Sequence, residues 1–219
     1  MGRWRRRLWA VLWAVAALAP AAYADENTPI YDLLEVRIQD RELLAIDSET
    51  GGQIAERLEL GEHVLFTRER GRVGIAVTDR RMLGVATISG FWQSERLRRR
   101  ERPPADAWLG DRVALLQTAQ RALGFVGRTG NFSEAGLGPR ERVVDRAVGA
   151  NVLVVVTERR ALGLSADRGG FFEIPLQVDE RSETLSAFAN HVTLETPLRL
   201  LVFRGNTGAW EESPRLLNP

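Results

Sequence analysis

Four glutamates recur about 40 residues apart along the chain: Glu62, Glu101, Glu141 and Glu180. Pro219 stands at the fifth position of this series, which we call the glutamate column. If the repeated segments form a ring, four carboxylates gathered at one end of it would bind cations or a basic partner. Alternatively, each glutamate accepts hydrogen bonds at a turn or pairs with an arginine of its own repeat. Because the column follows the repeat, the structural role explains it more simply. A catalytic site is expected to break the repeat.

Arginines supply the second set of candidates. The densest basic run, residues 96–102, departs from the other copies. Its guanidinium groups suit an anionic polysaccharide, a lipid headgroup or an acidic protein. Alternatively, this run and the charged turns are solvated surface. The candidate binding residues are Arg96, Arg98, Arg99, Arg100 and Arg102 in the run, Arg80, Arg81, Arg159 and Arg160 in two turns, and Trp108.

Motifs for catalysis, cofactors and metals are weak in this sequence. The two histidines, His63 and His191, occupy non-equivalent positions, and there is no cysteine. Two histidines without cysteine are poor evidence for zinc. The glycines of 124–130 do not have the spacing of a dinucleotide fingerprint. We therefore assign no catalytic, cofactor or metal residue, although an acid pair for glycoside hydrolysis stays open because its separation is three-dimensional.

An internal repeat must position these residues. One column contains Gln39, Thr78, Thr118, Thr157 and Thr196, spaced 39, 40, 39 and 39 residues apart. Five residues later the column is Leu44, Leu83, Leu123, Leu162 and Leu201, and twelve residues later it is Gly51, Gly90, Gly130, Gly169 and Gly208. Such a period is typical of solenoids, propellers and arrays. We expect a positive φ angle at the glycine column.

Each copy has the pattern of short antiparallel strands. Alternating apolar residues precede the threonine column, as in 73–77 and 152–156, and predict one strand. A tight turn at the threonine leads to a second strand, and the glycine loop leads to a third. The third strand carries the aromatic column Trp92, Phe132, Phe171 and Trp210. The segments 63–68 and 142–147 are candidates for the fourth strand.

The five copies resemble a five-bladed β-propeller, an architecture shared by some sugar-binding lectins and some glycoside-processing enzymes. The Gly-His to Trp-Asp signature of the WD repeat is missing. We expect an all-β fold of four-stranded antiparallel blades in repeats 25–62, 63–102, 103–142, 143–182 and 183–219. We expect the C-terminal strand to pair with the first blade and close the ring. In the irregular fifth copy, a one-residue slip would turn Val192 and Leu194 to the apolar face.

Residues 1–24 have the form of an export signal. Four arginines precede the apolar stretch 8–19, and Ala22-Tyr23-Ala24 offers a cleavage site. Removing those arginines leaves 26 of the 30 basic residues against 29 acidic ones, which argues against nucleic acid as a partner. We expect a periplasmic or extracellular domain, 25–219, with no membrane span after cleavage.

The leading hypothesis is an exported, non-catalytic, monomeric propeller that binds a protein or a glycan. One alternative is a carbohydrate-active enzyme, which predicts acidic side chains that converge on the central axis. The other is a multivalent lectin, which predicts that the aromatic column lies exposed in equivalent clefts. Packing of that column between neighbouring blades is the simpler expectation.

Overall fold

The computed structural model describes residues 32–215, so the signal predicted at 1–24 lies outside the described residues. The described part is entirely β-structure, with 19 antiparallel strands and no helix. It accordingly contains no helix long and apolar enough to cross a membrane. The strands form five sheets, one for each copy of the repeat, which confirms the all-β prediction.

Each sheet is a blade whose strands follow one another in sequence. The first blade has three described strands, β1 (Leu34–Gln39), β2 (Glu42–Asp47) and β3 (Gln53–Arg57). The second has β4 (Val64–Arg70), β5 (Val73–Thr78), β6 (Arg81–Ala86) and β7 (Trp92–Arg96). The third has β8 (Ala107–Leu109), β9 (Val113–Gln117), β10 (Arg121–Val126) and β11 (Asn131–Gly136). The fourth has β12 (Val143–Val148), β13 (Val152–Thr157), β14 (Arg160–Ser165) and β15 (Phe171–Pro175). The fifth has β16 (Thr184–Ala187), β17 (His191–Glu195), β18 (Arg199–Arg204) and β19 (Ala209–Pro214).

The glycine column takes the left-handed conformation that the sequence predicts. Its five members have φ angles between 66° and 72°, a region that other residues rarely adopt. The threonine column also forms the expected turns. Thr78, for example, accepts hydrogen bonds from the amides of Arg80 and Arg81 at 3.1 and 2.9 Å. The repeated columns therefore fix the turns that set the strand register.

The hydrophobic core lies between the blades, in one cluster at each junction. Strand β10 shows how neighbouring blades fit together. Gly124 lies against Leu164 of the fourth blade, where a Cβ atom would come within 2.7 Å of Leu164 Cδ2. On the other side, Phe125 fills the space above Gly84 of the second blade. Small residues thus admit the large side chains of the next blade.

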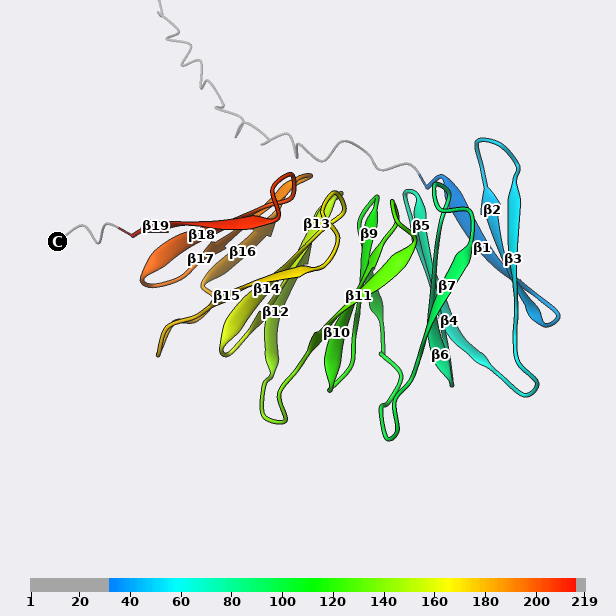
Figure 1. Cartoon of the computed structure of the whole chain (residues 1–219), viewed down its shortest axis with the longest axis horizontal. Helices are drawn as coiled ribbons and strands as arrows, with labels where there is room; N and C mark the ends of the chain where they lie inside the picture. Colours follow the sequence, from blue (N-terminus) through cyan, green and yellow to red (C-terminus); the bar gives the residue numbers. More distant parts are fainter. Residues whose placement is uncertain (1–31, 216–219) are drawn as a thin grey trace, which may run out of the picture.

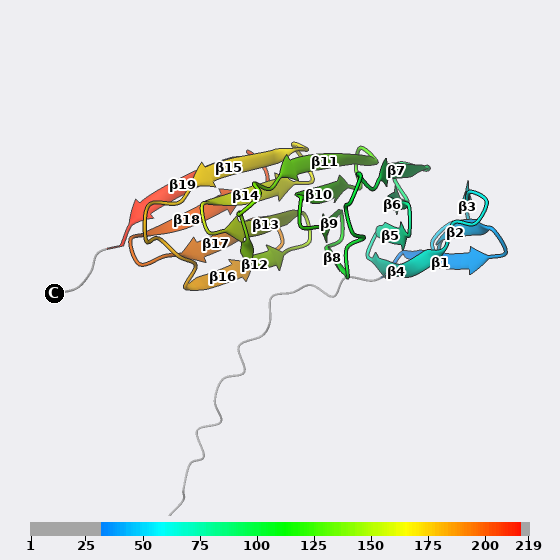
Figure 2. The same ribbon diagram turned by 90° about the horizontal axis from the view of Figure 1, so that it is seen from below.

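The five blades stand in a row, with β1–β3 at one end and β16–β19 at the other (Figure 1). Figure 2 shows β4, β8, β12 and β16 along one edge of the row and β7, β11, β15 and β19 along the other. The fold is a five-bladed propeller, but the described residues form an open array. The predicted closure is wrong for them, because β19 pairs with β18 from Arg199↔Pro214 to Arg204↔Ala209 and completes its own blade.

The fifth copy keeps the register of the others, so the predicted slip is also wrong. Leu194 pairs with Leu201 just as Val155 pairs with Leu162 in the fourth blade. Val192 and Leu194 pack against the fourth blade. The alternate residues of β17 face away from the array, where residues 32–215 place no further blade to bury them. Their polarity therefore fits the end of an array.

Candidate functional site

A buried Glu–Arg–Thr cluster joins each pair of neighbouring blades. At the junction of the second and third blades, Arg121 Nε and Nη2 donate to the two carboxylate oxygens of Glu101, both at 2.9 Å. Arg121 Nη2 also donates to the carbonyl of Arg96, the last residue of β7, at 2.8 Å. Thr118 Oγ1 donates to Glu101 at 2.7 Å. One guanidinium group therefore connects the third blade to the end of the second.

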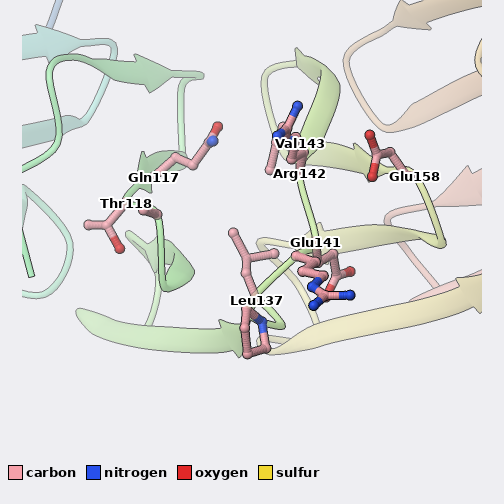
Figure 3. A pocket seen from close by; sticks show the side chains of 10 residues that line it. Gln117, Thr118, Leu137, Glu141, Arg142, Val143 and Glu158 are labelled. Carbon is pink, nitrogen blue, oxygen red and sulfur yellow. The ribbon is translucent and has the colours of Figure 1, made fainter.

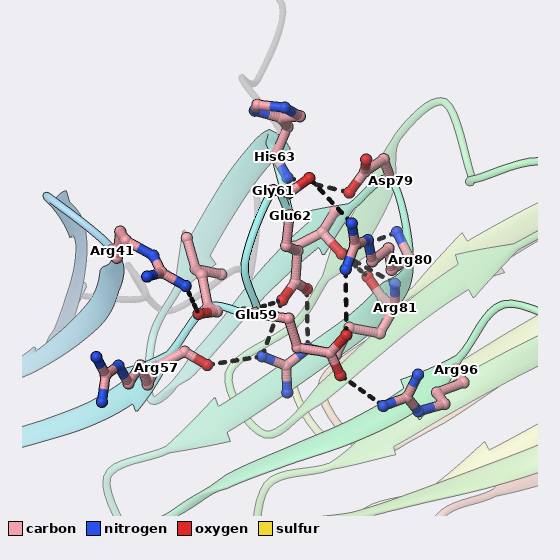
Figure 4. Close-up of polar contacts among 12 residues, drawn as sticks. Arg41, Arg57, Glu59, Gly61, Glu62, His63, Asp79, Arg80, Arg81 and Arg96 are labelled. Carbon is pink, nitrogen blue, oxygen red and sulfur yellow. Dashed lines mark hydrogen bonds and ion pairs between the residues drawn. The ribbon is translucent and has the colours of Figure 1, made fainter.

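The same cluster occurs at the other three junctions. At the first of them, Arg81 binds Glu62 through Nε and Nη2 and the Arg57 carbonyl at 2.9 Å (Figure 4). The corresponding arginines at the remaining junctions are Arg160 and Arg199, which bind Glu141 and Glu180. Each of the four glutamates also accepts a hydrogen bond from a backbone amide of its own turn, as the structural alternative predicted. Its arginine partner, however, belongs to the next repeat, so the predicted pairing within one repeat is wrong.

Charge pairing keeps these glutamates ionised although they are buried. Burial alone would raise the pKa of Glu141, but hydrogen bonds from Arg160, the Gly138 amide and Thr157 outweigh it and lower the pKa to about 2. The pKa values of Glu62, Glu101 and Glu180 are lowered by equivalent partners against the same effect of burial. The column is thus a set of structural anions.

The four turn arginines predicted to bind a partner fall into two pairs, one inside the clusters and one outside them. Arg81 and Arg160 belong to the clusters and hold blades together. Arg80 and Arg159 are exposed, and Arg80 pairs with Glu59 at 3.3 Å. Only the second pair is available at the surface. The functional prediction for these positions stays a prediction.

The arginine run lies at the end of β7 and in the loop that follows it. Arg96 pairs with Glu59 of the loop after β3, and Arg98 pairs with Glu134 of β11, both at 2.5 Å. These two side chains therefore reach the neighbouring blades on either side. The others in the run, Arg99, Arg100 and Arg102, are exposed and form no ion pair with a described residue.

The aromatic column packs between neighbouring blades, which was the simpler of the two expectations for it. Trp92 is 9% exposed, and its indole N–H donates to the Ile54 carbonyl of the first blade at 3.0 Å. Trp210 donates in the same way to the Phe172 carbonyl of the fourth blade at 2.9 Å. The ring of Phe132 packs against that of Phe125 in a tilted arrangement, with 5.1 Å between the ring centres. This column does not supply the exposed stacking faces that the lectin alternative requires.

A cleft of about 660 Å³ opens between the third and fourth blades (Figure 3). It lies between the turn after β9 on one side and the loop between β11 and β12 on the other. Its lining combines apolar, cationic and anionic groups: Leu137, Pro139 and Val143, then Arg140 and Arg142, then Glu141 and Glu158, with Gln117, Thr118 and Ala119 from the turn.

Gln117 is the unusual residue of this cleft. The equivalent residues of the second and fourth blades are Val77 and Val156, which are fully buried. The Oε1 atom of Gln117 is buried and accepts no hydrogen bond within the described chain. An unpaired buried acceptor costs free energy, so its presence calls for a donor from outside. The signal that could have identified Gln117 from the sequence is that a glutamine stands where the second and fourth copies have valine.

A second hollow, of about 390 Å³, lies along the edge formed by β4, β8 and β12. Trp108 lines it and is half-buried there. The guanidinium carbon of Arg146 lies 4.1 Å from the centre of the indole ring. Trp108 is thus a predicted binding residue that the structure places in a hollow. Glu69 also lines it, and burial, then Asp32 and Glu35, raise the pKa of this carboxyl group.

The carbohydrate-enzyme alternative predicts several carboxylates that converge on the axis. The hollow on the β4–β8–β12 edge instead combines three arginines, one tryptophan and a single glutamate. Within residues 32–215, no group of three or more His, Asp or Glu side chains is arranged to hold a metal ion.

Comparison with known proteins gives no family. No protein-family model matches the chain, and no curated protein matches it. Among solved structures, it is similar to Prp20p from Saccharomyces cerevisiae, with 8% identity, a TM-score of 0.41, and coverage of 78% of this chain and 55% of that one. It is also similar to apo AztD from Citrobacter koseri, with 10% identity, a TM-score of 0.40, and coverage of 84% and 60%. The chain spans a little over half the length of these proteins, and likeness at this level identifies no function.

Proposed function

We propose that the chain is an exported binding protein without catalysis of its own, and that it holds an acidic sugar in the cleft between the third and fourth blades. The observation that carries this proposal is the buried, unpaired Oε1 atom of Gln117. Gln117 breaks the repeat and is one of the residues that line the cleft. Loops and turns on a rigid scaffold are common places for binding residues.

The chemistry of the lining supports an acidic sugar. The Gln117 oxygen needs a donor, which a sugar hydroxyl supplies. Arg140 and Arg142 are exposed cations without an ion pair to a described residue, and they suit a carboxylate through paired N–H donors. Glu158 offers a further acceptor for hydroxyl groups. A uronic acid carries both a carboxylate and several hydroxyl groups in one small ring.

The state of Glu141 favours binding over hydrolysis in this cleft. A general acid works best with a pKa near the working pH. Glu141 has a pKa of about 2 and is held by Arg160 at 2.8 Å, so it is an anion with a structural role. The exposed Glu158 has no described partner that would orient it as an acid or a base. The cleft is therefore better equipped to hold a ligand than to cleave one.

The test is titration of the purified protein with an oligogalacturonate and with the matched neutral oligogalactoside. We expect saturable binding of the acidic sugar only. Gln117→Val restores the residue type of the other blades and removes the acceptor. It should weaken binding about tenfold or more while leaving the fold intact or slightly stabilised, since the unpaired acceptor is gone. Gln93→Val, on β7 of the second blade, is the matched control.

Equal binding of the two sugars, or full binding by Gln117→Val, would contradict the proposal. The proposal also includes export to the periplasm or the exterior of the cell, and a monomeric state. Export rests on the arginines and apolar stretch of residues 1–24. N-terminal sequencing and the solution mass of the same sample test both, with Asp25 expected as the first residue.

A further inference from the structure

The hollow beside Trp108 exists because one edge strand is short. Strand β8 has three residues, whereas its neighbours along the edge, β4 and β12, have seven and six. All three are the first strands of their blades, and Figure 2 shows them in a row along one edge of the array. The short strand leaves a recess across three blades, which we call the edge groove. Its lining is Arg68, Glu69, Arg70, Ala107, Trp108, Leu109, Arg146 and Val148.

The edge groove carries an excess of positive charge. Arg68 is paired with Asp106 at 3.1 Å. Among residues 32–215, the side chain of Arg70 has only a long hydrogen bond, 3.4 Å, to the Leu109 carbonyl, and Arg146 has no ion pair. Two guanidinium groups, from the second and fourth blades, are therefore free to bind carboxylates on either side of Trp108.

The stacking of Arg146 on Trp108 decides which ligand fits. A guanidinium group stacked on an aromatic ring keeps the N–H donors at its edge, so it is held in place for a carboxylate. The same stacking covers a face of the indole. Trp108 also packs against the core between the third and fourth blades. Little of the ring is left for a sugar to stack on, which favours a carboxylate on a flexible chain.

We propose that the edge groove binds an acidic, extended segment of a partner protein, with carboxylate side chains at Arg70 and Arg146 and an apolar contact at Trp108. The spacing of these groups across successive blades suits an extended chain, since packed sheets lie about 10 Å apart and successive residues of a strand advance about 3.3 Å. This surface is separate from the Gln117 cleft in its residues and in its ligand.

The test is binding of a labelled short oligoglutamate peptide, measured by anisotropy, with the matched oligoglutamine peptide as the neutral probe. We expect the acidic peptide to bind and the neutral one to fail. Arg146→Gln should weaken binding about tenfold or more. Arg128→Gln removes the same charge from an exposed turn outside the groove and should leave binding unchanged. Gln117→Val should also leave it unchanged, which separates this proposal from the sugar-binding one.

Trp108→Phe tests the stack with little risk to the fold, because phenylalanine keeps an apolar ring but binds a cation less well than tryptophan. It should weaken peptide binding by a smaller factor than Arg146→Gln. Equal losses for Arg146→Gln and Arg128→Gln would overturn the proposal, as would oligogalacturonate displacing the peptide from the groove. A further variant replaces Asp25 and Glu26 of this chain by their amides, Asp25→Asn and Glu26→Gln. If the peptide bound only to that variant, the proposal would be overturned, since the groove would then be occupied by the chain's own acidic segment.

Discussion

The blades have two kinds of face: inner faces, which pack against a neighbouring blade, and outer faces, which lie at the two ends of the array. Both kinds share one backbone pattern but differ in their side chains. In the second blade, Gly74 and Ala76 face the first blade and are buried. At the equivalent positions of the first blade, Glu35 and Arg37 face away from the array and are exposed. They pair with each other at 2.7 Å. The difference shows that burial, and not strand geometry, selects the residues at each position.

The fifth blade ends the array in the same way at the other end. In β17, Thr193 and Glu195 face outward at positions where the fourth blade has Val154 and Val156, both fully buried. Terminal repeats with polar outer faces are the usual means of ending a stack of repeats. The junction cluster ends too, since Glu42 stands in the first blade where the other blades have its arginine. Both ends are therefore adapted to solvent.

The largest expected difference between inner and outer sites concerns the junction arginines. Arg121→Met leaves Glu101 buried without its partner, which should lower the free energy of unfolding by about 3–5 kcal/mol. Arg37→Met breaks an exposed ion pair and should change it by less than about 1 kcal/mol. Urea unfolding followed by circular dichroism measures both. Similar effects would show that the junction clusters add no more than a surface pair.

The leucine column allows an identical substitution at an inner and an outer site. Leu162 is 1% exposed between the third and fourth blades, whereas Leu44 is half-buried on the outward face of the first blade. Leu162→Ala should cost about 2–5 kcal/mol and Leu44→Ala about 1 kcal/mol, because only the first leaves a closed cavity. The same unfolding measurement compares them. An equal cost at Leu44 would mean that another surface buries the first blade in solution.

Acid should weaken the inner junctions before it affects the outer faces. The pKa of Glu141 is about 2 in the folded protein, below its ordinary value of 4.5. A lowered folded-state pKa stabilises the fold above the unfolded-state pKa, and the stabilisation is lost as pH falls from about 4.5 to 2. We therefore expect unfolding midpoints to fall across that range. Glu141→Gln should make the decline shallower, and an unchanged slope would contradict this origin.

The sequence allowed the blades to be predicted because their determinants are local. The glycine and leucine columns, the alternating strands and the threonine turns each depend on a few neighbouring residues, and the structure confirms them. The glutamate column was predicted only as two alternatives. Its arginine partners lie 19 or 20 residues away, as with Glu101 and Arg121, so the sequence did not choose between them.

The two candidate sites show the same limit. Gln117 was visible as a departure from an apolar column, but the cleft that it lines exists only when two blades meet. Trp108 was predicted as a surface candidate, but its stack on Arg146 joins residues of different blades. The arginines of the run were predicted together, and the structure separates Arg98, which is paired, from Arg99, which is exposed.

The sequence by itself determined the repeat, the short antiparallel strands of each copy and the positive φ angles of the five glycines. Only the tertiary structure decided that the described array is open, that the glutamates are structural anions and that a hollow forms beside the short strand β8. The physical reason is distance. Turns and strand register follow from neighbouring residues, whereas burial, ion pairing and clefts depend on which blade lies on each face.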